Sequence, residues 1–193
     1  METRHESSEL EKLVEAAKRK KFVVLDTETT GLRGAVEIVQ IAVLDLAGET
    51  LLDTLVKPMK AIQLGAIALH GITEDMVAKA PNFAVVSDWL EAIIRDKDVI
   101  VYNAAFDRRV LYSSAELARL PRKEWEEFRW FCAMEAYAEF YGDWDSYHES
   151  YRWQKLTNAC RQQGLPVEYG AHTAIADCRM TLSLVNHMVS AFW

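Results

Sequence analysis

The ten residues FVVLDTETTG, at positions 22–31, decide how the rest of the chain is interpreted. The first four form a continuous apolar run of strand-forming residues, which is typical of a strand buried on both faces. Two carboxylates, Asp26 and Glu28, follow directly, before a turn at Gly31. Side chains two residues apart in an extended chain point to the same side. The stretch therefore predicts two like charges, side by side, at the end of a core strand.

Composition limits the class of protein. The chain has 193 residues and a formal net charge of −7, with half of its residues hydrophobic. This length allows one domain with a substantial core, and the acidic balance argues against a basic face that coats duplex nucleic acid. No apolar run predicts a membrane span or a secretory signal. The three cysteines lack metal-like spacing and their odd number argues against a disulfide framework, so we expect a reducing, cytoplasmic setting.

Periodicity and turn signals predict a single α/β domain in which a mixed sheet is flanked by helices. A hairpin that turns at Gly48 should join the second and third strands. We expect strands over residues 21–26, 37–48, 50–58 and 98–103, and a short one within 129–142. We expect helices over residues 8–20, 83–95, 104–117 and 173–193, and also within 129–142 and 153–165.

Two further acids are candidates to reach the same place as Asp26 and Glu28. Asp107 lies in the first turn of a helix that directly follows a buried strand, and Asn103 is placed to cap that helix. Strand ends next to helix starts form the rim of an α/β sheet, where such folds bind ligands. Asp177 lies about one turn into the last helix, on a partly apolar face. Hard divalent cations would relieve the repulsion among these carboxylates.

Each of these residues also has a simpler interpretation. The pair at the strand end could be solvated, Asp107 could only favour its helix dipole, and Asp177 could lie on the surface. His172 could be an ordinary exposed loop residue, although a neutral imidazole near bound cations is a good base near pH 7.

Four motifs occur together in a known order and spacing: DTETTG (26–31), HGIT (70–73), NAAFD (103–107) and HTAIAD (172–177). In these motifs the chain resembles the DEDDh, or DnaQ-like, 3′–5′ exonucleases, typified by the proofreading subunit of bacterial replicative polymerases. The resemblance covers roughly residues 20–190. It implies a ribonuclease H-like fold with a mixed five-stranded sheet, an exonuclease domain over residues 22–193, and a helical extension over residues 1–21.

The resemblance also implies the residues of the site. Two divalent ions, Mg²⁺ or Mn²⁺, would be held by Asp26, Glu28, Asp107 and Asp177. His172 would be the general base. Substrate contacts would come from Thr29, Leu32, Ile72, Asn103 and Phe106. Tyr102 departs from the pattern, since many members have histidine there, but it is not one of the five catalytic positions.

The implied activity is metal-dependent hydrolysis that releases nucleoside 5′-monophosphates from 3′ ends of single-stranded or frayed DNA. An exoribonuclease that trims RNA 3′ ends and a catalytically idle nucleic-acid-binding module remain the alternatives. A polymerase or another nucleic-acid-processing protein is left open as a partner. The end of the chain close to its last helix favours a stand-alone exonuclease or an excised domain.

Two predictions are balanced against ordinary packing. Leu32 and Ile72 match family positions that pack on terminal bases, but both could simply be core residues. The aromatic stretch 140–154 could be a binding surface, but attachment of a long loop to the domain is the favoured interpretation.

Overall fold

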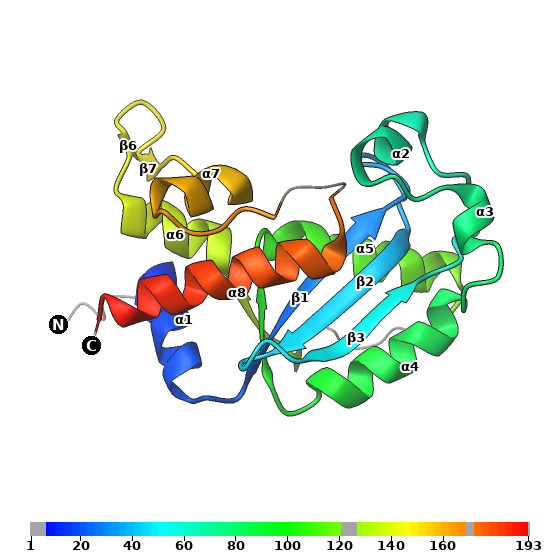
Figure 1. Cartoon of the computed structure of the whole chain (residues 1–193), viewed down its shortest axis with the longest axis horizontal. Helices are drawn as coiled ribbons and strands as arrows, with labels where there is room; N and C mark the ends of the chain where they lie inside the picture. The colour runs from blue at the N-terminus through cyan, green and yellow to red at the C-terminus, as the bar shows by residue number, and fades with distance from the viewer. Residues whose placement is uncertain (1–6, 121–126, 169–171, 193) are drawn as a thin grey trace, which may run out of the picture.

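A five-stranded mixed sheet, in the order β3-β2-β1-β4-β5, forms the centre of the protein (Figure 1). The computed structural model describes residues 7–120, 127–168 and 172–192. The central strand β1 is antiparallel to β2 and parallel to β4; β2 and β3 are antiparallel, and β4 and β5 parallel. The strands are β1 (Phe22–Thr29), β2 (Ile38–Asp45), β3 (Thr50–Leu55), β4 (Asp98–Val101) and β5 (Arg129–Cys132). The predicted mixed sheet is confirmed.

Helices cover both faces of this sheet (Figure 1). One face carries α1 (Glu9–Lys18), α6 (Ala133–Tyr141) and α8 (Ala174–Ser190), with α7 (Leu156–Gln162) packed on α8. The other face carries α4 (Phe83–Ile94) and α5 (Ala104–Leu117). The remaining elements are α2 (Leu64–His70), α3 (Glu74–Val77) and a small hairpin of β6 (Trp144–Asp145) and β7 (Ser150–Tyr151). Within the described ranges no helix is both long and apolar enough to span a membrane.

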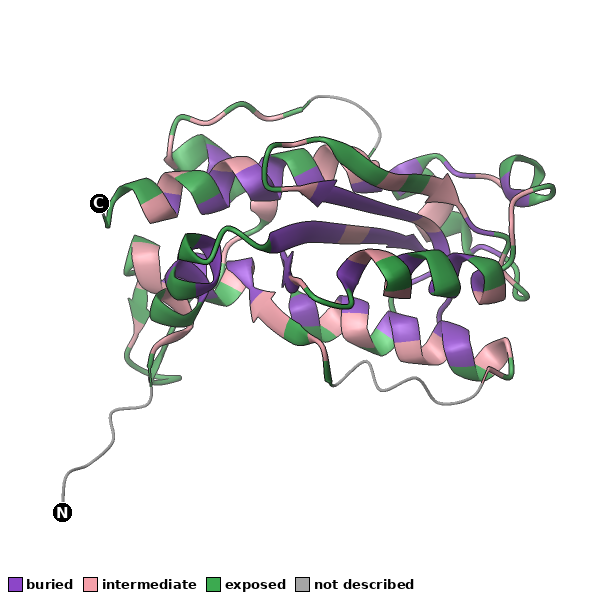
Figure 2. Ribbon diagram, turned by 90° about the horizontal axis from the view of Figure 1, so that it is seen from below, coloured by how far each residue is buried: buried purple, intermediate pink, exposed green. Residues whose placement is uncertain are grey.

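β1 is buried on both sides, as its apolar run predicts (Figure 2). Val23 and Leu25 point into a cluster shared with α4 and α5. Phe22 and Val24 point into a second cluster, shared with α1, α6 and α8. A strand between two helical layers has no polar face, which explains why its sequence does not alternate.

α1 packs directly on the domain. Leu13 is fully buried in the same cluster as α6 and α8, and Ser8 begins the helix with a capping box that it forms with Glu11. The carboxylate of Glu139, on α6, accepts two backbone N–H groups from the first turn of α1. Just beyond α1, Arg19 pairs with Asp98 at the start of β4. The leading helix therefore shares its core with the following residues, and the division of the chain at residue 21 stays a prediction.

Several boundaries differ from the predicted ones, for local reasons. β1 continues through Thr29 because β2 still pairs with it there. α2 is not signalled by the sequence, since Gln63 before it makes no side-chain capping bond. Asn103 precedes α5 as predicted but does not cap it. Its φ of 122° lies outside the extended conformation that places a capping side chain over the first N–H groups.

Residues 140–154 also differ from the favoured interpretation. They form the end of α6 and the β6–β7 hairpin; Phe140 packs against the core, and Tyr141 stacks on the buried ring of Tyr137. Five aromatic side chains of the stretch are exposed: Tyr141, Trp144, Tyr147, Tyr151 and Trp153. Attachment of a loop through its aromatic rings is therefore wrong for most of this segment.

Candidate active site

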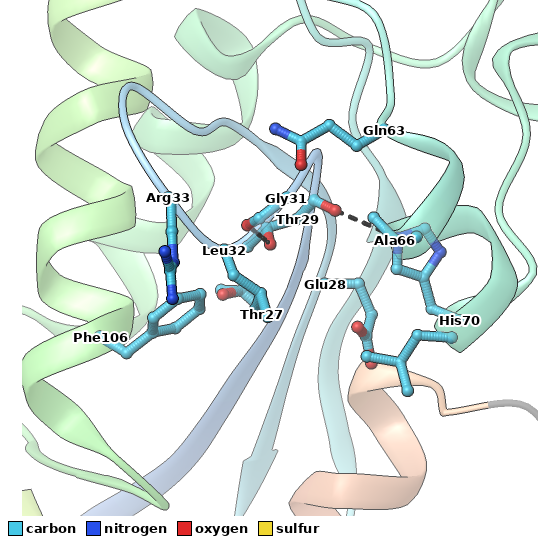
Figure 3. Close-up of a pocket in the computed structure, with 12 residues that line it drawn as sticks. Thr27, Glu28, Thr29, Gly31, Leu32, Arg33, Gln63, Ala66, His70 and Phe106 are labelled. Carbon is cyan, nitrogen blue, oxygen red and sulfur yellow. Dashed lines mark hydrogen bonds between the residues drawn. The ribbon is translucent and has the colours of Figure 1, made fainter.

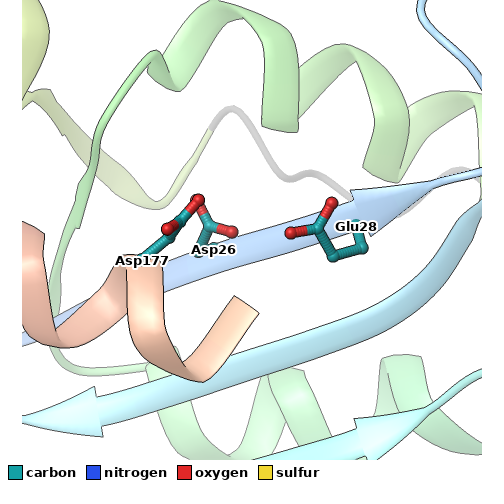
Figure 4. A group of neighbouring side chains, drawn as sticks. All are labelled: Asp26, Glu28 and Asp177. Atoms are coloured by element: carbon teal, nitrogen blue, oxygen red, sulfur yellow. The ribbon is translucent and has the colours of Figure 1, made fainter. Parts of the chain in front are cut away.

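Three carboxylates from distant parts of the chain meet at the C-terminal part of β1 (Figure 4). Asp26 and Glu28 lie on β1 and Asp177 lies in the first turn of α8. One potential ligand oxygen of each lies within 4.8 Å of the others. β4 pairs with β1 only as far as Leu25, so the part of β1 that carries the two acids extends past its neighbour. This leaves open space beside the acids at the rim of the sheet.

The start of α8 is held firmly, which fixes the position of Asp177. Thr173 caps the helix with its hydroxyl group, and the side-chain oxygen of Gln40 accepts a backbone N–H at its first residue. The thiol of Cys178 donates to backbone carbonyl groups of β1 and β2. Asp177 is therefore attached to the same two strands that carry Asp26 and Glu28.

The other two predicted catalytic residues line the same cavity of about 190 Å³. Asp107, in the first turn of α5, is buried, and its Oδ1 accepts a 2.7 Å hydrogen bond from the hydroxyl group of Thr27. His172 comes from the segment before α8, and its Nδ1 lies 3.7 Å from Oδ2 of Asp177. The structure thus brings all five predicted catalytic side chains around one cavity, although Asp107 stands outside the group of three.

Burial raises the pKa of all four carboxyl groups, and repulsion from other acids of the group adds to it for Asp26, Glu28 and Asp107. The pKa of Asp26 is held well above its usual range by burial and then by the charges of Asp107, Asp177 and Glu28. Burial, followed by the charges of Asp177 and then Asp107, raises the pKa of Glu28 to about 8. Burial raises the pKa of Asp107 to about 7 against the hydrogen bond from Thr27. Burial also raises the pKa of Asp177, against the nearby His172.

The four acids have no permanently charged basic side chain beside them, because no lysine or arginine lines the described part of the cavity. Four carboxylates are costly to bury under these conditions unless a cation joins them. Their oxygen atoms are the ligands that Mg²⁺ and Mn²⁺ prefer, so the side chains present fit the two divalent ions that the sequence predicts.

A second cleft, of about 350 Å³, adjoins this cavity and shares Glu28 and Phe106 with it (Figure 3). Leu32 lines the cleft with 67% of its surface exposed. Arg109 holds this arrangement, because it donates to the backbone carbonyl of Leu32 at 3.1 Å and its guanidinium group lies over the Phe106 ring. Thr29 lines the cleft as well, but its hydroxyl group is engaged by the carbonyl of Gly31.

The other two predicted substrate residues have different fates. Asn103 is exposed and lines the cavity that holds the four acids. Ile72 lines neither cleft, because it is 3% exposed and packs in a small core cluster with Val39, Ile62 and Val77. This burial favours ordinary core packing for Ile72, and its contact with bases stays a prediction.

His70 has a structural role that its place in the HGIT motif did not reveal. His70 is buried, and its Nδ1 accepts the backbone N–H of Ile72. Its Nε2 must then carry the proton that bonds the carbonyl of Thr29 at 3.1 Å. A ring whose Nδ1 accepts a hydrogen bond is neutral, and burial favours this form by lowering the pKa of His70. The neutral ring holds the end of β1 against α2.

Two further positions support the site. A Cβ atom at Gly31 would lie 2.5 Å from the side chain of Gln63, so only glycine fits there without movement. Tyr102, the departure from the family pattern, lines the acid cavity and donates its hydroxyl group to the carbonyl of Gln154. It therefore joins the site to the segment that follows the β6–β7 hairpin.

Comparisons with known proteins agree with this geometry. The family described as Exonuclease (RNase_T) matches residues 23–185. An uncharacterized exonuclease of Escherichia phage 186 is 41% identical over 167 residues, covering 85% of this chain and 86% of that protein. Exodeoxyribonuclease 10 of Escherichia coli K12 is 33% identical over 177 residues, covering 88% of this chain and 70% of that protein. The solved structure of exonuclease X in complex with 5′ overhanging duplex DNA has a TM-score of 0.65 at 28% identity, covering 89% of this chain and 93% of that one.

Proposed function

Because the chain belongs to the DnaQ-like, DEDDh-type exonuclease family, we propose that it releases nucleoside 5′-monophosphates from the 3′ ends of single-stranded or frayed DNA. Family membership makes it an exonuclease that acts on nucleic acid; the direction, the DNA substrate and the use of two metals are our proposal. One observation carries it: the carboxylates of Asp26, Glu28 and Asp177 converge within 4.8 Å. Carboxylates that converge in this way can hold the divalent cations that assist phosphodiester hydrolysis.

We assign the four acids as ligands of two divalent ions, Mg²⁺ or Mn²⁺. Asp26, Glu28 and Asp177 would hold one ion, with Asp26 shared between both and Asp107 supporting the second. When bound, such a pair stabilises the attacking and leaving oxygens of an in-line displacement. The raised pKa values of these carboxyl groups support this assignment, because cations would replace the protons that the cluster otherwise retains.

We assign His172 as the general base. Its Nδ1 faces Asp177, which leaves Nε2 to take the proton from the attacking water. The oxygen of that water bonds to phosphorus, the bond from phosphorus to the 3′-oxygen breaks, and the leaving 3′-oxygen takes a proton from solvent to become the new 3′-hydroxyl group of the shortened strand. A well-placed general base contributes roughly 10²–10⁴-fold to such a step. The 45% exposure of the His172 side chain supports this role, since water can reach it.

We propose that the cleft beside the acids receives the terminal nucleotide. Leu32 and Phe106 offer apolar surfaces for a base, and such packing is tolerant of sequence because every base has a π-face. Arg33 is the one lysine or arginine among the described residues that line this cleft, and it would oppose the repulsion of a phosphate by the acids. Thr29 would contribute through its backbone, and Asn103 through its exposed side chain.

Similar proteins support the choice of DNA and a candidate partner. The relative named exodeoxyribonuclease 10 and the DNA-bound exonuclease X favour DNA over RNA as the substrate. Relatives named DNA polymerase III subunit epsilon support a polymerase as a partner. A reducing, cytoplasmic setting stays our prediction, and the three free, buried cysteines accord with it.

Degradation of labelled oligonucleotides tests the proposal. With Mg²⁺ or Mn²⁺, the purified chain should release mononucleotides at once from a 3′-labelled single strand, and a 5′-labelled strand should shorten stepwise. EDTA should abolish both, and Asp26→Asn should be inactive, whereas the exposed control Asp96→Asn should be fully active. Faster turnover on the matched RNA than on DNA would show that RNA is the preferred substrate. Failure to release mononucleotides with either metal, or release from the 5′ end, would refute the proposal.

A further inference from the structure

A second surface of the molecule has features that the nuclease site does not explain. Seven aromatic side chains are exposed in the described part of the chain, and five of them lie within residues 141–153. These five are Tyr141, Trp144, Tyr147, Tyr151 and Trp153. Exposed aromatic side chains gathered in one place mark interaction sites, because Trp and Tyr supply large contact areas with few rotatable bonds.

The hairpin that presents these rings is fixed by its own hydrogen bonds. The carboxylate of Asp145 accepts two backbone N–H groups of the turn and lies within hydrogen-bond distance of His148 Nδ1 and Arg152 Nε. Across the strands, the rings of Trp144 and Tyr151 stand edge to face with centroids 5.0 Å apart. A surface held in one conformation loses little entropy when it binds a partner.

Between this hairpin, α1 and α6 lies a cleft of about 320 Å³, which we call the acidic–aromatic cleft. Its chemically distinctive lining consists of three aromatic and four acidic side chains: Trp144, Tyr151, Trp153, Glu9, Glu135, Glu139 and Glu149. No lysine or arginine lines it among the described residues. Glu9 is paired with Lys12, and Glu139 receives the first N–H groups of α1. Glu135 and Glu149 make no ion pair with any described residue, so their charges are available to a ligand.

We propose that the acidic–aromatic cleft docks an arginine-bearing basic segment of a partner protein. A guanidinium group can stack on an indole or phenol ring while it donates two hydrogen bonds to a carboxylate, and this cleft offers both. Nucleic acid is disfavoured because the cleft would set four glutamates against its phosphates. A symmetric dimer through this face is disfavoured as well, since it would set the glutamates of two copies against each other.

The cleft is separate from the nuclease site, although the chain connects the two. None of the residues that line the acidic–aromatic cleft lines the cavity of the four acids. Directly after the hairpin, the carbonyl of Gln154 accepts the hydroxyl of Tyr102, and Leu156 lines the acid cavity. A partner held in the cleft would thus lie near the catalytic residues without covering them. Docking and hydrolysis can therefore be measured independently.

Titration calorimetry of the whole chain with short synthetic peptides tests the proposal. We use a peptide that alternates arginine with leucine, and matched peptides with glutamine or glutamate for arginine. Only the arginine peptide should bind. Trp153→Ala, and separately the pair Glu135→Gln and Glu149→Gln, should each weaken its binding about tenfold. The control pair Asp96→Asn and Glu116→Gln removes equal charge from other exposed sites and should leave both binding and hydrolysis unchanged.

The remaining outcomes would overturn the proposal. Equal weakening by the control pair would show that the peptide responds to net charge alone. Loss of single-strand binding on Trp153→Ala, with peptide binding intact, would make nucleic acid the occupant. If the chain forms a dimer and Trp153→Ala dissociates it, the occupant of the cleft is a second copy of the chain. Failure of the arginine peptide to bind would rule out a basic segment as the occupant of the cleft. Trp153 is 65% exposed, so Trp153→Ala should leave the melting curve measured by circular dichroism unchanged. If that variant melts at a lower temperature, the Glu135→Gln and Glu149→Gln pair tests the cleft in its place.

Discussion

The sheet carries buried carboxylates at both ends, and the two ends differ in how charge is balanced. At the start of β4, Asp98 is fully buried between two arginines: Nη2 of Arg19 lies 2.7 Å from its Oδ2, and Nε of Arg129 lies 2.5 Å from its Oδ1. At the end of β1, four carboxylates share one cavity that no described lysine or arginine lines. The first end joins α1, β4 and β5; the second end joins β1, α5 and α8.

This contrast indicates different roles for Asp98 and for the four acids of the cavity. An acid enclosed by arginines is compensated within the chain, so it serves the fold. Acids that repel one another lower the stability of the metal-free chain, and their retention indicates a ligand from outside it. Removing an acid should therefore have opposite effects at the two ends. At the unbalanced end it should lower activity and raise metal-free stability, and at the balanced end it should lower stability alone. Four experiments separate them.

The largest effect is expected at the unbalanced end. Asp26→Asn should lower kcat on the order of 10⁴-fold, because it removes a carboxylate that we assign to both metal ions. The same change should raise the melting temperature of the metal-free chain, since one of four repelling groups is gone. Gel assays and melts in EDTA measure the two effects, with Asp96→Asn as the neutral control. A metal-free Asp26→Asn protein that melts earlier than the parent would break the comparison.

A smaller loss of activity is expected at the rim of the same cavity. His172→Ala should lower kcat by roughly 10²–10⁴-fold, because no other positioned group takes the proton of the attacking water. Mn²⁺ affinity should be nearly unchanged, since the acids and not the imidazole supply the ligands. Single-turnover kinetics measures the loss of rate, and titration calorimetry measures the affinity for Mn²⁺. Turnover equal to that of the parent would remove His172 from the role of base.

The pH dependence of stability follows from the raised pKa values. The pKa of Glu28 rises from 4.5 to about 8 and that of Asp107 from 3.8 to about 7, so the folded chain holds protons that the unfolded chain releases. Stability in EDTA should therefore fall as the pH rises from about 5 to about 8, by up to about 1.4 kcal/mol per pH unit for each extra proton held. Mg²⁺ should remove most of this slope. Melting temperatures that rise with pH in EDTA would contradict the repulsion.

The balanced end should affect stability alone. Asp98→Asn should lower the free energy of unfolding by about 3 kcal/mol, because it leaves two arginines facing an uncharged group. Arg19→Gln should cost at most about 1 kcal/mol, since that side chain is half-exposed and Arg129 remains. Urea unfolding measures both, and kcat per folded molecule should equal that of the parent. A defect in kcat for folded Asp98→Asn would show that this end also serves catalysis.

Local pattern singled out the acids as candidates, and the resemblance to the DEDDh family joined them into one site. Asp26 and Glu28 share a side because strands alternate, and Asp107 and Asp177 follow from their places in first helical turns. The balanced end could not be predicted this way. Asp98 and Arg129 meet only through the pairing of β4 with β5, and Arg19 reaches the same carboxylate from just beyond α1. Such contacts depend on packing between elements that sequence periodicity does not encode.

The same limit explains why residue type did not decide between packing and exposure. Leu32 and Ile72 are similar apolar residues next to turns, yet one is 67% exposed and the other 3%. Their burial is set by tertiary position, which residue type alone does not give. The aromatic residues of the hairpin have no periodicity that would assign them to an inner or outer face. Asn103 is a good capping residue by type, but its backbone conformation prevents it from capping.

One further consequence concerns Cys178, which follows Asp177 directly. Its thiol is fully buried against the backbone of β1 and β2, and burial raises its pKa well above the usual range. Alkylating reagents react with exposed thiolates, so they reach it only when α8 separates from the sheet. That separation also carries Asp177 away from Asp26. The labelling rate of this one cysteine, resolved by mass spectrometry, therefore reports how often the catalytic centre disassembles in the native protein.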